Sequence, residues 1–345
     1  MRSEAIGHAS PGLARRPVAR RRPATRTLVR AAALVTLALA VAAFSFAAPG
    51  FATATNLANV VEQSTVLALL AFGMTIVVIA GGPDVVRGGI DLSLAANLGL
   101  CNAVYASLSN AGTGDIVASG LAVGVGGLVG MVNAAAVTGF GVLPLLATLA
   151  TMNVCTGAEL VITQNTVLTT SSPLLGFITS TSALGLSLTD WILVAATAML
   201  LFVMHATPVG LRLRAVGGHH RAARAAGLPV RAIGAGAYVA AGLLAGLAAI
   251  VQAARLSGSS PGSGDILLSV VLTSLLGVVF SRRLQPSIGG TLVAVLFIGC
   301  LVNGFQLVNV SSYWVNGIEG ALILSVVALR SAVQRGGRRP AAEAA

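Results

Sequence analysis

The chain is 345 residues long, 56% of its residues are apolar and only 9% are charged, and its formal net charge is +11 at pH 7. Soluble domains carry about 25% charged residues, and a soluble protein with so few could not cover its surface with polar groups. The composition therefore excludes an ordinary soluble enzyme or nucleic-acid-binding domain. It predicts a protein that spans a membrane with helices, since the alternating strands of a membrane barrel are absent.

The N-terminal segment is basic and contains several prolines. Residues 1–30 hold eight arginines, and Pro11, Pro17 and Pro23 lie among them, so we expect a disordered cytoplasmic tail at 1–27. The apolar run that follows is either an uncleaved membrane helix or a signal peptide that is removed near the small residues 52–54. A run of about 18 apolar residues exceeds the 7–15 of a typical signal peptide, which favours the membrane helix.

Ten apolar segments have about the length that a helix needs to cross a membrane. The expected fold class is all-α, a polytopic membrane protein of about ten transmembrane helices, with its membrane domain at 28–332 and a cytoplasmic tail at 333–345. The third segment starts irregularly, and the eighth is short, with 16 uncharged residues between Asp265 and Arg282. The segments run roughly 28–48, 64–81, 89–108, 116–138, 143–163, 189–205, 232–253, 265–281, 287–309 and 312–331.

Arginine is the basic residue at all 21 positions, and positive charge concentrates in the cytoplasmic connections of membrane proteins. With ten spans and a cytoplasmic N-terminus, 20 of the 21 arginines fall on the cytoplasmic side and Arg255 alone falls outside. This distribution predicts that both termini and the connection at 207–231 are cytoplasmic. Because lysine is absent, the chain also lacks a P-loop, and any ATP hydrolysis that drives it must occur in another chain.

Glycine is frequent in the fourth and seventh predicted spans. Gly120 and Gly124, Gly126 and Gly130, and Gly242 and Gly246 each have the spacing that lets two helix backbones approach closely. Close packing within the chain is one interpretation, and a seam with a second copy is the other.

Catalytic and metal-binding patterns are absent from the sequence. Cys101, Cys155 and Cys300 lie in apolar stretches with unrelated spacing, which is typical of small buried side chains. No H-E-x-x-H or G-x-S-x-G pattern and no pair of catalytic carboxylates occurs. We therefore expect neither catalysis nor a cofactor in this chain.

A few polar residues interrupt the apolar segments. Asp91 and Ser93 precede the third apolar run, where an aspartate is either an intramembrane acid or an ordinary residue that fixes the start of a helix. Four others lie within predicted spans: Asn153, Glu159, Asn303 and Gln306. They should face the protein interior or a water-filled path, and hydrogen bonds between helices explain them equally well.

The 207–231 connection is the longest hydrophilic one expected in the cytoplasm. Gly217-Gly218 should break the chain, and His219 to Ala226 should form a short basic helix that ends at Gly227, with Pro229 beyond it. Such a helix is either a docking surface for a partner or a basic loop without a further role. The adjacent His219 and His220 cannot share a helix face to bind a metal.

Two patterns along the chain match those of one protein family. The connection reads A-V-G-G-H-H-R-A-A-R-A-A-G from residue 215, and G-M-T-I-V-V-I at 73–79 is followed by G-I-D-L-S at 89–93. These resemble the coupling pattern A-x-G-G-N-x-x-A-x-R-x-S-G and the pattern G-M-T-x-V-I-x … G-I-D-L-S of the permeases of ribose-, xylose- and arabinose-type ABC importers, relatives of the branched-chain amino-acid permeases. Further similarities, in order from about residue 50 to 330, are Asn56-Leu57, Gln63-Ser64, Ala254-Arg255-Leu256, Gly262-Ser263-Gly264 and Val310-Ser311-Ser312-Tyr313.

The resemblance implies a permease subunit in the bacterial inner membrane with a ten-span fold. It also implies three partners: a cytoplasmic ABC ATPase that binds ATP and magnesium, an extracytoplasmic solute-binding protein, and a second permease copy in a homodimer or heterodimer. The residues that would couple this chain to the ATPase are Gly217, Gly218, His220, Ala222, Ala223, Arg224 and Gly227.

The chain departs from the family at several places. His219 stands where the family usually has asparagine, and His220-Arg221 where an acidic residue is common. Extra residues lie between Ile79 and Gly89, and the glycine-rich pattern expected after the eighth span is missing. A path with few ionisable groups suits a neutral polar solute such as a monosaccharide. The alternative, a self-sufficient secondary transporter, would place ion-coupling carboxylates at mid-membrane and need no docking loop.

Overall fold

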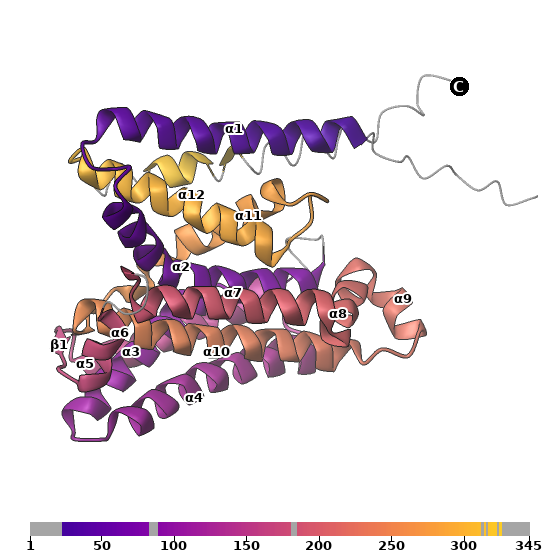
Figure 1. Cartoon of the computed structure of the whole chain (residues 1–345). Helices are drawn as coiled ribbons and strands as arrows, with labels where there is room; N and C mark the ends of the chain where they lie inside the picture. Colours follow the sequence, from indigo (N-terminus) through magenta and orange to yellow (C-terminus); the bar gives the residue numbers. More distant parts are fainter. Residues whose placement is uncertain are drawn as a thin grey trace, which may run out of the picture.

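Apolar helices account for almost all of the regular structure in the computed structural model, which describes residues 23–82, 89–180, 185–311, 314, 317–322 and 324–325. Most of them lie side by side with roughly parallel axes (Figure 1). The helices are α1 Pro23–Ala47, α2 Ala54–Gly81, α3 Leu94–Asn110, α4 Asp115–Ala134 with a π-helical turn Ala135–Gly139, α5 Pro144–Thr163, α6 Pro173–Thr179, α7 Leu188–Ala206, α8 Pro208–Gly218, α9 His220–Ala225, α10 Val230–Leu256, α11 Leu267–Phe280 and α12 Ile288–Leu307. A 3-10 turn, Ser263–Ile266, precedes α11, and strand β1 Leu168–Thr169 pairs antiparallel with β2 Gly258–Ser259.

Seven helices in the described part of the chain are long and apolar enough to cross a membrane: α1, α2, α4 with its π-helical turn, α5, α7, α10 and α12. Two more helices, α3 with 17 residues and α11 with 14, are shorter. The last predicted segment, 312–331, lies mostly outside the described residues, as do the two tails and the residues inserted at 83–88. The prediction of a helical, multi-pass membrane protein is confirmed, whereas the count of ten spans is not established.

Helix α3 begins at Leu94, five residues later than predicted. Gly89 lies so close to α2 that a β-carbon there would overlap the carbonyl oxygen of Val77. Gly89 therefore packs on the α2 backbone, residues 89–93 are not helical, and α3 starts only after Ser93.

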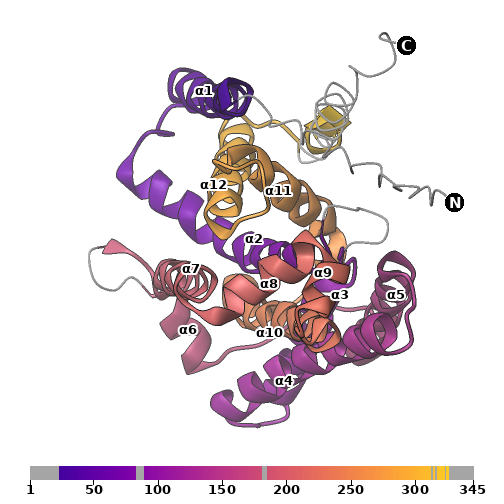
Figure 2. The same cartoon turned by 90° about the vertical axis from the view of Figure 1, so that its right-hand side faces the viewer.

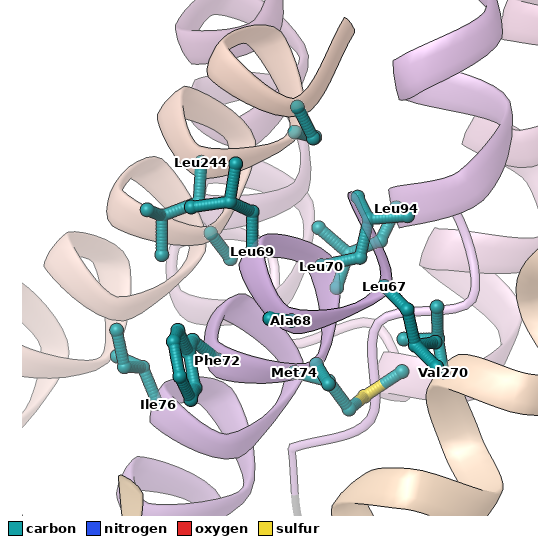
Figure 3. Packing of buried hydrophobic residues seen from close by; sticks show 14 of the residues in the cluster. Leu67, Ala68, Leu69, Leu70, Phe72, Met74, Ile76, Leu94, Leu244 and Val270 are labelled. Carbon is teal, nitrogen blue, oxygen red and sulfur yellow. The ribbon is translucent and has the colours of Figure 1, made fainter. Parts of the chain in front are cut away.

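Helix α2 forms the centre of the fold. In its most apolar stretch 89% of the residues are buried, compared with 6% in that of α1. In Figure 3, Leu69 lies beside Leu244 of α10 and Met74 beside Val270 of α11, all within one buried cluster. A helix that is apolar on every side is stable at such a position because neighbours cover all of its faces.

Helix α1 lies at the edge of the bundle beside α11 and α12 (Figures 1 and 2). The ring of Phe44 in α1 meets the ring of Phe305 edge-on, with 5.1 Å between the centroids. It also fills the space above Gly304, where a β-carbon would lie 2.5 Å from the ring. These contacts join α1 to α12.

Helices α4 and α10 touch along their backbones. A β-carbon at Gly126 would lie 2.5 Å from the Gly242 carbonyl oxygen, and one at Gly246 would lie 2.7 Å from the Val123 α-carbon. The glycine pairs 126/130 and 242/246 thus serve packing within one chain, as the first interpretation holds. Gly120 and Gly124 differ, because nothing in the described part of the chain lies within 4 Å of their β-positions.

The two ends of the bundle differ in charge. Helices α8 and α9 lie at one end, together with the start of α1 and the α11–α12 connection, which carries Arg282 and Arg283 (Figures 1 and 2). Helix α10 runs from this α8–α9 end to the other, where β1 and β2 pair and where Arg255 lies. Among the described residues, Arg255 is therefore separated from the other arginines, as the sequence predicts.

Candidate coupling segment and buried polar groups

The coupling segment, residues 207–231, packs on the end of α2 through glycine. In α8, a β-carbon at Gly217 would overlap the carbonyl oxygen of Ile79, and a β-carbon at Gly82 would lie 2.5 Å from the Gly217 carbonyl oxygen. The prediction that Gly217-Gly218 breaks the chain is wrong, since both are the last residues of α8. Glycine is needed at 217 because two backbones meet there, and the chain turns one residue after Gly218, at His219, with φ −159° and ψ 95°.

Helix α9 forms as predicted and has a clear cap at each end. The Nδ1 atom of His219 accepts a hydrogen bond from the backbone N–H of Ala222 at 3.2 Å. At the other end Gly227 has φ +81°, and the N–H of Leu228 donates to the Ala223 carbonyl at 3.0 Å. The His219 side chain thus caps the start of α9, a position at which asparagine is also a favoured residue. Histidine in place of the family's asparagine is therefore compatible with the same helix start.

The seven predicted coupling residues divide by their exposure. Ala223 is buried and Gly217 is covered by α2, whereas the other five, Gly218, His220, Ala222, Arg224 and Gly227, are exposed. The exposed members lie on the surface of the α8–α9 end, and the two covered ones hold the segment on the bundle. This division suits a segment that is anchored on one side and free to meet a partner on the other.

A cavity of about 390 Å³, which we call the inner cavity, opens beside α9. Its basic lining residues are His220, Arg224 and Arg231, and its wall includes the π-helical turn after α4. Val77, Ala80 and Gly81 of α2 complete the wall, with Tyr238 of α10. The end of the central helix and the coupling segment therefore border the same space.

Asp91 and Ser93 belong to one buried hydrogen-bond cluster. The backbone N–H and hydroxyl of Ser93 donate to Asp91 Oδ1 at 2.9 and 2.6 Å. Asn133 of α4 donates from Nδ2 to the Ser93 hydroxyl at 2.8 Å and to Asp91 Oδ1 at 3.3 Å. These bonds support the interpretation that Asp91 fixes the start of α3, and they tie it to α4. Sequence reasoning did not single out Asn133, although an amide in an apolar helix is itself a signal.

The two predicted path residues of α5, Glu159 and Asn153, differ in burial. Glu159 is 2% exposed, and its carboxylate lies against α3 at Gly99, where a β-carbon would be 2.5 Å from Oε2. Asn153 is exposed, and its Nδ2 donates to the carbonyl of Leu149 one turn earlier in α5 at 2.8 Å. Of the two, only Glu159 points into the described part of this chain.

Asn303 and Gln306 lie near the β1–β2 end in α12. The Oδ1 atom of Asn303 accepts a hydrogen bond from Asn56 Nδ2 at 2.8 Å and so links α12 to the start of α2. Gln306 lines a cavity of about 240 Å³, the outer cavity. The outer cavity also contains Gln63, Ser64, Ser269 and Glu319, and the Ser269 hydroxyl donates to Glu319 Oε2 at 2.6 Å.

The six predicted path residues do not meet at one point. Asp91 and Ser93 lie between α3 and α4, Glu159 against α3, and Asn303 and Gln306 across the bundle in α12. Sequence reasoning missed a buried hydroxyl cluster in which Thr75 of α2 lies 2.8 Å from Thr291 of α12 and 3.4 Å from Ser274 of α11. Single hydroxyls in apolar helices give no periodic signal, so this cluster emerges only from the packing. In the part of the chain that the structure covers, no group of three or more histidine, cysteine, aspartate or glutamate side chains could hold a metal ion.

Comparison with known proteins places these features in a family. The family model of the branched-chain amino acid transport system permease component matches residues 56–327. The ribose import permease of Escherichia coli K12 is 33% identical over 311 residues, which cover 87% of this chain and 93% of that protein. The ribose import permease of Bacillus subtilis 168 is 34% identical over 284 residues, 81% of this chain and 86% of that protein.

A third relative carries a different sugar in its name. The L-arabinose ABC transporter permease of Azospirillum brasilense is 29% identical over 321 residues, which cover 92% of each chain. No solved structure gives a significant match to this chain.

Proposed function

Because the chain belongs to the branched-chain amino acid transport permease family, among the permeases of ABC sugar importers, we propose that it imports a monosaccharide or a similar small neutral solute. Transport would be driven by ATP hydrolysis in a separate ABC ATPase subunit. An extracytoplasmic solute-binding protein would deliver the solute, and a second permease copy would complete the membrane unit.

The observation that carries this proposal is the contact between α8 and the end of α2. The backbones of Gly217 and Ile79 touch with no side chain between them, so a force on the coupling segment reaches α2 directly. Helix α2 lines the inner cavity with Val77, Ala80 and Gly81 and the outer cavity with Gln63, Ser64 and Leu67. One helix therefore connects the proposed ATPase contact to a space at each end of the bundle.

The lining of the outer cavity fits a neutral, hydrogen-bonding solute. Gln63, Ser64, Ser269 and Gln306 offer amide and hydroxyl groups, which bind hydroxyls of a sugar without demanding a charge. The carboxylate of Glu319 already accepts the Ser269 hydroxyl. We propose that solute enters at this end, which would face outward, and that the α8–α9 end and both termini are cytoplasmic.

The exposed face of α5 supports a second permease copy. Asn153 places an amide on the outside of a membrane helix, and nothing in the described chain lies within 4 Å of the β-position of Gly157 one turn later. Polar side chains in a bilayer usually face protein, so we propose that the second copy packs here. An Asn153→Cys variant should cross-link into dimers in membranes, whereas the native, buried Cys155 two residues later should not. Monomers alone from the variant would contradict this surface.

Reconstitution tests the proposed function as a whole. The chain would be co-expressed with a candidate ABC ATPase and a candidate solute-binding protein, purified through a tag on the permease, and placed in proteoliposomes. We expect the ATPase to co-purify and sugar uptake to require both ATP and the binding protein. Uptake by the permease alone, without ATP, would instead support a self-sufficient secondary transporter.

A further inference from the structure

A third cavity lies where α7 turns into α8, at the edge of the α8–α9 end. Its volume is about 360 Å³, and it is lined by Met204, His205, Ala206, Thr207, Pro208, Leu211 and Arg214. None of the seven coupling residues from Gly217 to Gly227 lines it, and it shares no lining residue with the inner cavity. We call it the elbow cavity.

The chain segment that forms the elbow cavity carries positively charged residues and no negatively charged ones. His205 and Arg214 are both exposed, and residues 191–264 contain no aspartate or glutamate at all. Asp190 and Asp265, which bound that stretch, lie at the opposite end of the bundle. The Nδ1 atom of His205 lies 3.0 Å from the Leu201 carbonyl; when both ring nitrogens carry a proton, Nδ1–H donates to this carbonyl and Nε2–H can donate to an anion. The cavity therefore suits an anion.

The surface beside the cavity is apolar and exposed. Phe202 on the last turns of α7 is 64% exposed, and Val209 and Leu211 on α8 are 55% and 71% exposed. The 19 residues of α7 span about 28 Å, close to the roughly 30 Å thickness of a hydrocarbon core, so Ala206 lies near the membrane boundary. A basic cavity thus adjoins exposed apolar side chains at the depth where lipid headgroups meet acyl chains.

We propose that the elbow cavity binds an anionic phospholipid. Its headgroup phosphate lies between His205 and Arg214, and its acyl chains cover Phe202, Val209 and Leu211. A phospholipid matches both parts of this surface. A free anion would leave Val209 and Leu211 of α8 uncovered, and a neutral lipid would leave Arg214 without an anionic partner. The cavity lies in the part of the coupling segment that precedes Gly217, whereas the proposed ATPase contact is formed by the exposed residues from Gly218 to Gly227.

Native mass spectrometry of the detergent-purified chain tests this proposal after incubation with equal amounts of phosphatidylglycerol and phosphatidylcholine. We expect the wild type to retain phosphatidylglycerol preferentially. An Arg214→Gln variant should retain about fivefold less, as expected for one arginine near a membrane surface, and His205→Gln should also retain less. Arg212→Gln is the matched control, since Arg212 is exposed on the same helix two residues away but does not line the cavity.

Several outcomes would overturn the proposal. If Arg214→Gln retained as much phosphatidylglycerol as the wild type, the proposed site would be wrong. If Arg212→Gln lost as much lipid as Arg214→Gln, the lipid would be attracted by positive charge in general and not by this cavity. Displacement of the lipid by millimolar inorganic phosphate would identify a phosphate site instead. Loss of ATPase co-purification from Arg214→Gln with unchanged lipid retention would assign the cavity to the ATPase contact. Unchanged co-purification together with the fivefold loss supports the lipid site, whatever the outcome of the uptake assay.

Discussion

Replacing Gly217 with alanine should displace α8 from the end of α2. A β-carbon at 217 would overlap the Ile79 carbonyl oxygen and would also lie 3.5 Å from the carbonyl carbon of Ala80. Ordinary contact begins at 3.4 Å, so α8 must move by more than about 1 Å for the methyl group to fit. Because the obstacle is backbone and cannot rotate away, we expect the upper end of the overpacking range, about 3 kcal/mol.

Such a free-energy change alters the equilibrium between docked and displaced α8 by about a hundredfold, since about 1.4 kcal/mol corresponds to a factor of ten. The adjacent Gly218 provides a matched control for stability. Nothing in the described chain lies within 4 Å of its β-position, and its φ is not positive. Alanine at 218 should leave the melting temperature unchanged or raise it, because alanine favours helix over glycine by up to about 1 kcal/mol.

Two measurements check the reasoning. Thermal unfolding of the detergent-purified permease should show a lower midpoint for Gly217→Ala than for Gly218→Ala. In proteoliposomes with the partner subunits, Gly217→Ala should hydrolyse ATP with reduced solute uptake per ATP. Wild-type stability and wild-type uptake in Gly217→Ala would show that the α8–α2 contact is neither tight nor used for coupling.

Three further substitutions test the packing, the polar cluster and the coupling surface. Gly242→Leu should destabilise the α4–α10 contact by more than about 3 kcal/mol and lower the yield of folded protein. Gly120→Leu, with open space around its β-position, should not lower the yield. Equal yields of the two variants would contradict the packing. Asn133→Ala removes a hydrogen-bond donor from buried Asp91 and should cost about 1–3 kcal/mol in unfolding experiments, and an unchanged midpoint would show that the cluster is not needed. Arg224→Glu should reduce ATPase co-purification without affecting membrane insertion, and full co-purification would show that α9 is not the docking surface.

Local signals in the sequence predict local structure well. Gly227 and Pro229 mark the end of α9, and the structure ends the helix at Ala225 with a positive φ at Gly227. The apolar segments likewise coincide with helices wherever both are defined. Such features depend on neighbours in the chain, which a reader of the sequence can see.

Contacts between distant segments do not follow from the sequence in the same way. Gly217 looks like a helix breaker but is a helical residue that needs α2 against it. Asn133 and Asn153 are both asparagines in apolar helices, yet Asn133 is buried and Asn153 is exposed. The sequence around them predicts the same burial for both. Their actual burial depends on which face of each helix a neighbouring helix covers, and the sequence does not show this.

The short pairing of β1 with β2 has a mechanical consequence. The Thr170 N–H donates to the Ser257 carbonyl at 2.9 Å, and Asn110 donates from Nδ2 to the Thr169 carbonyl at 3.0 Å. These bonds join the end of α3, the loop after α5 and the end of α10 into one clamp. With α10 held at the clamp, its 27 residues act as a lever about 40 Å long. A tilt of about 5° at the clamp would swing the start of α10, beside the coupling segment, through about 3.5 Å. Small rotations at the clamped end thus become displacements of atomic size at the start of α10, next to α9.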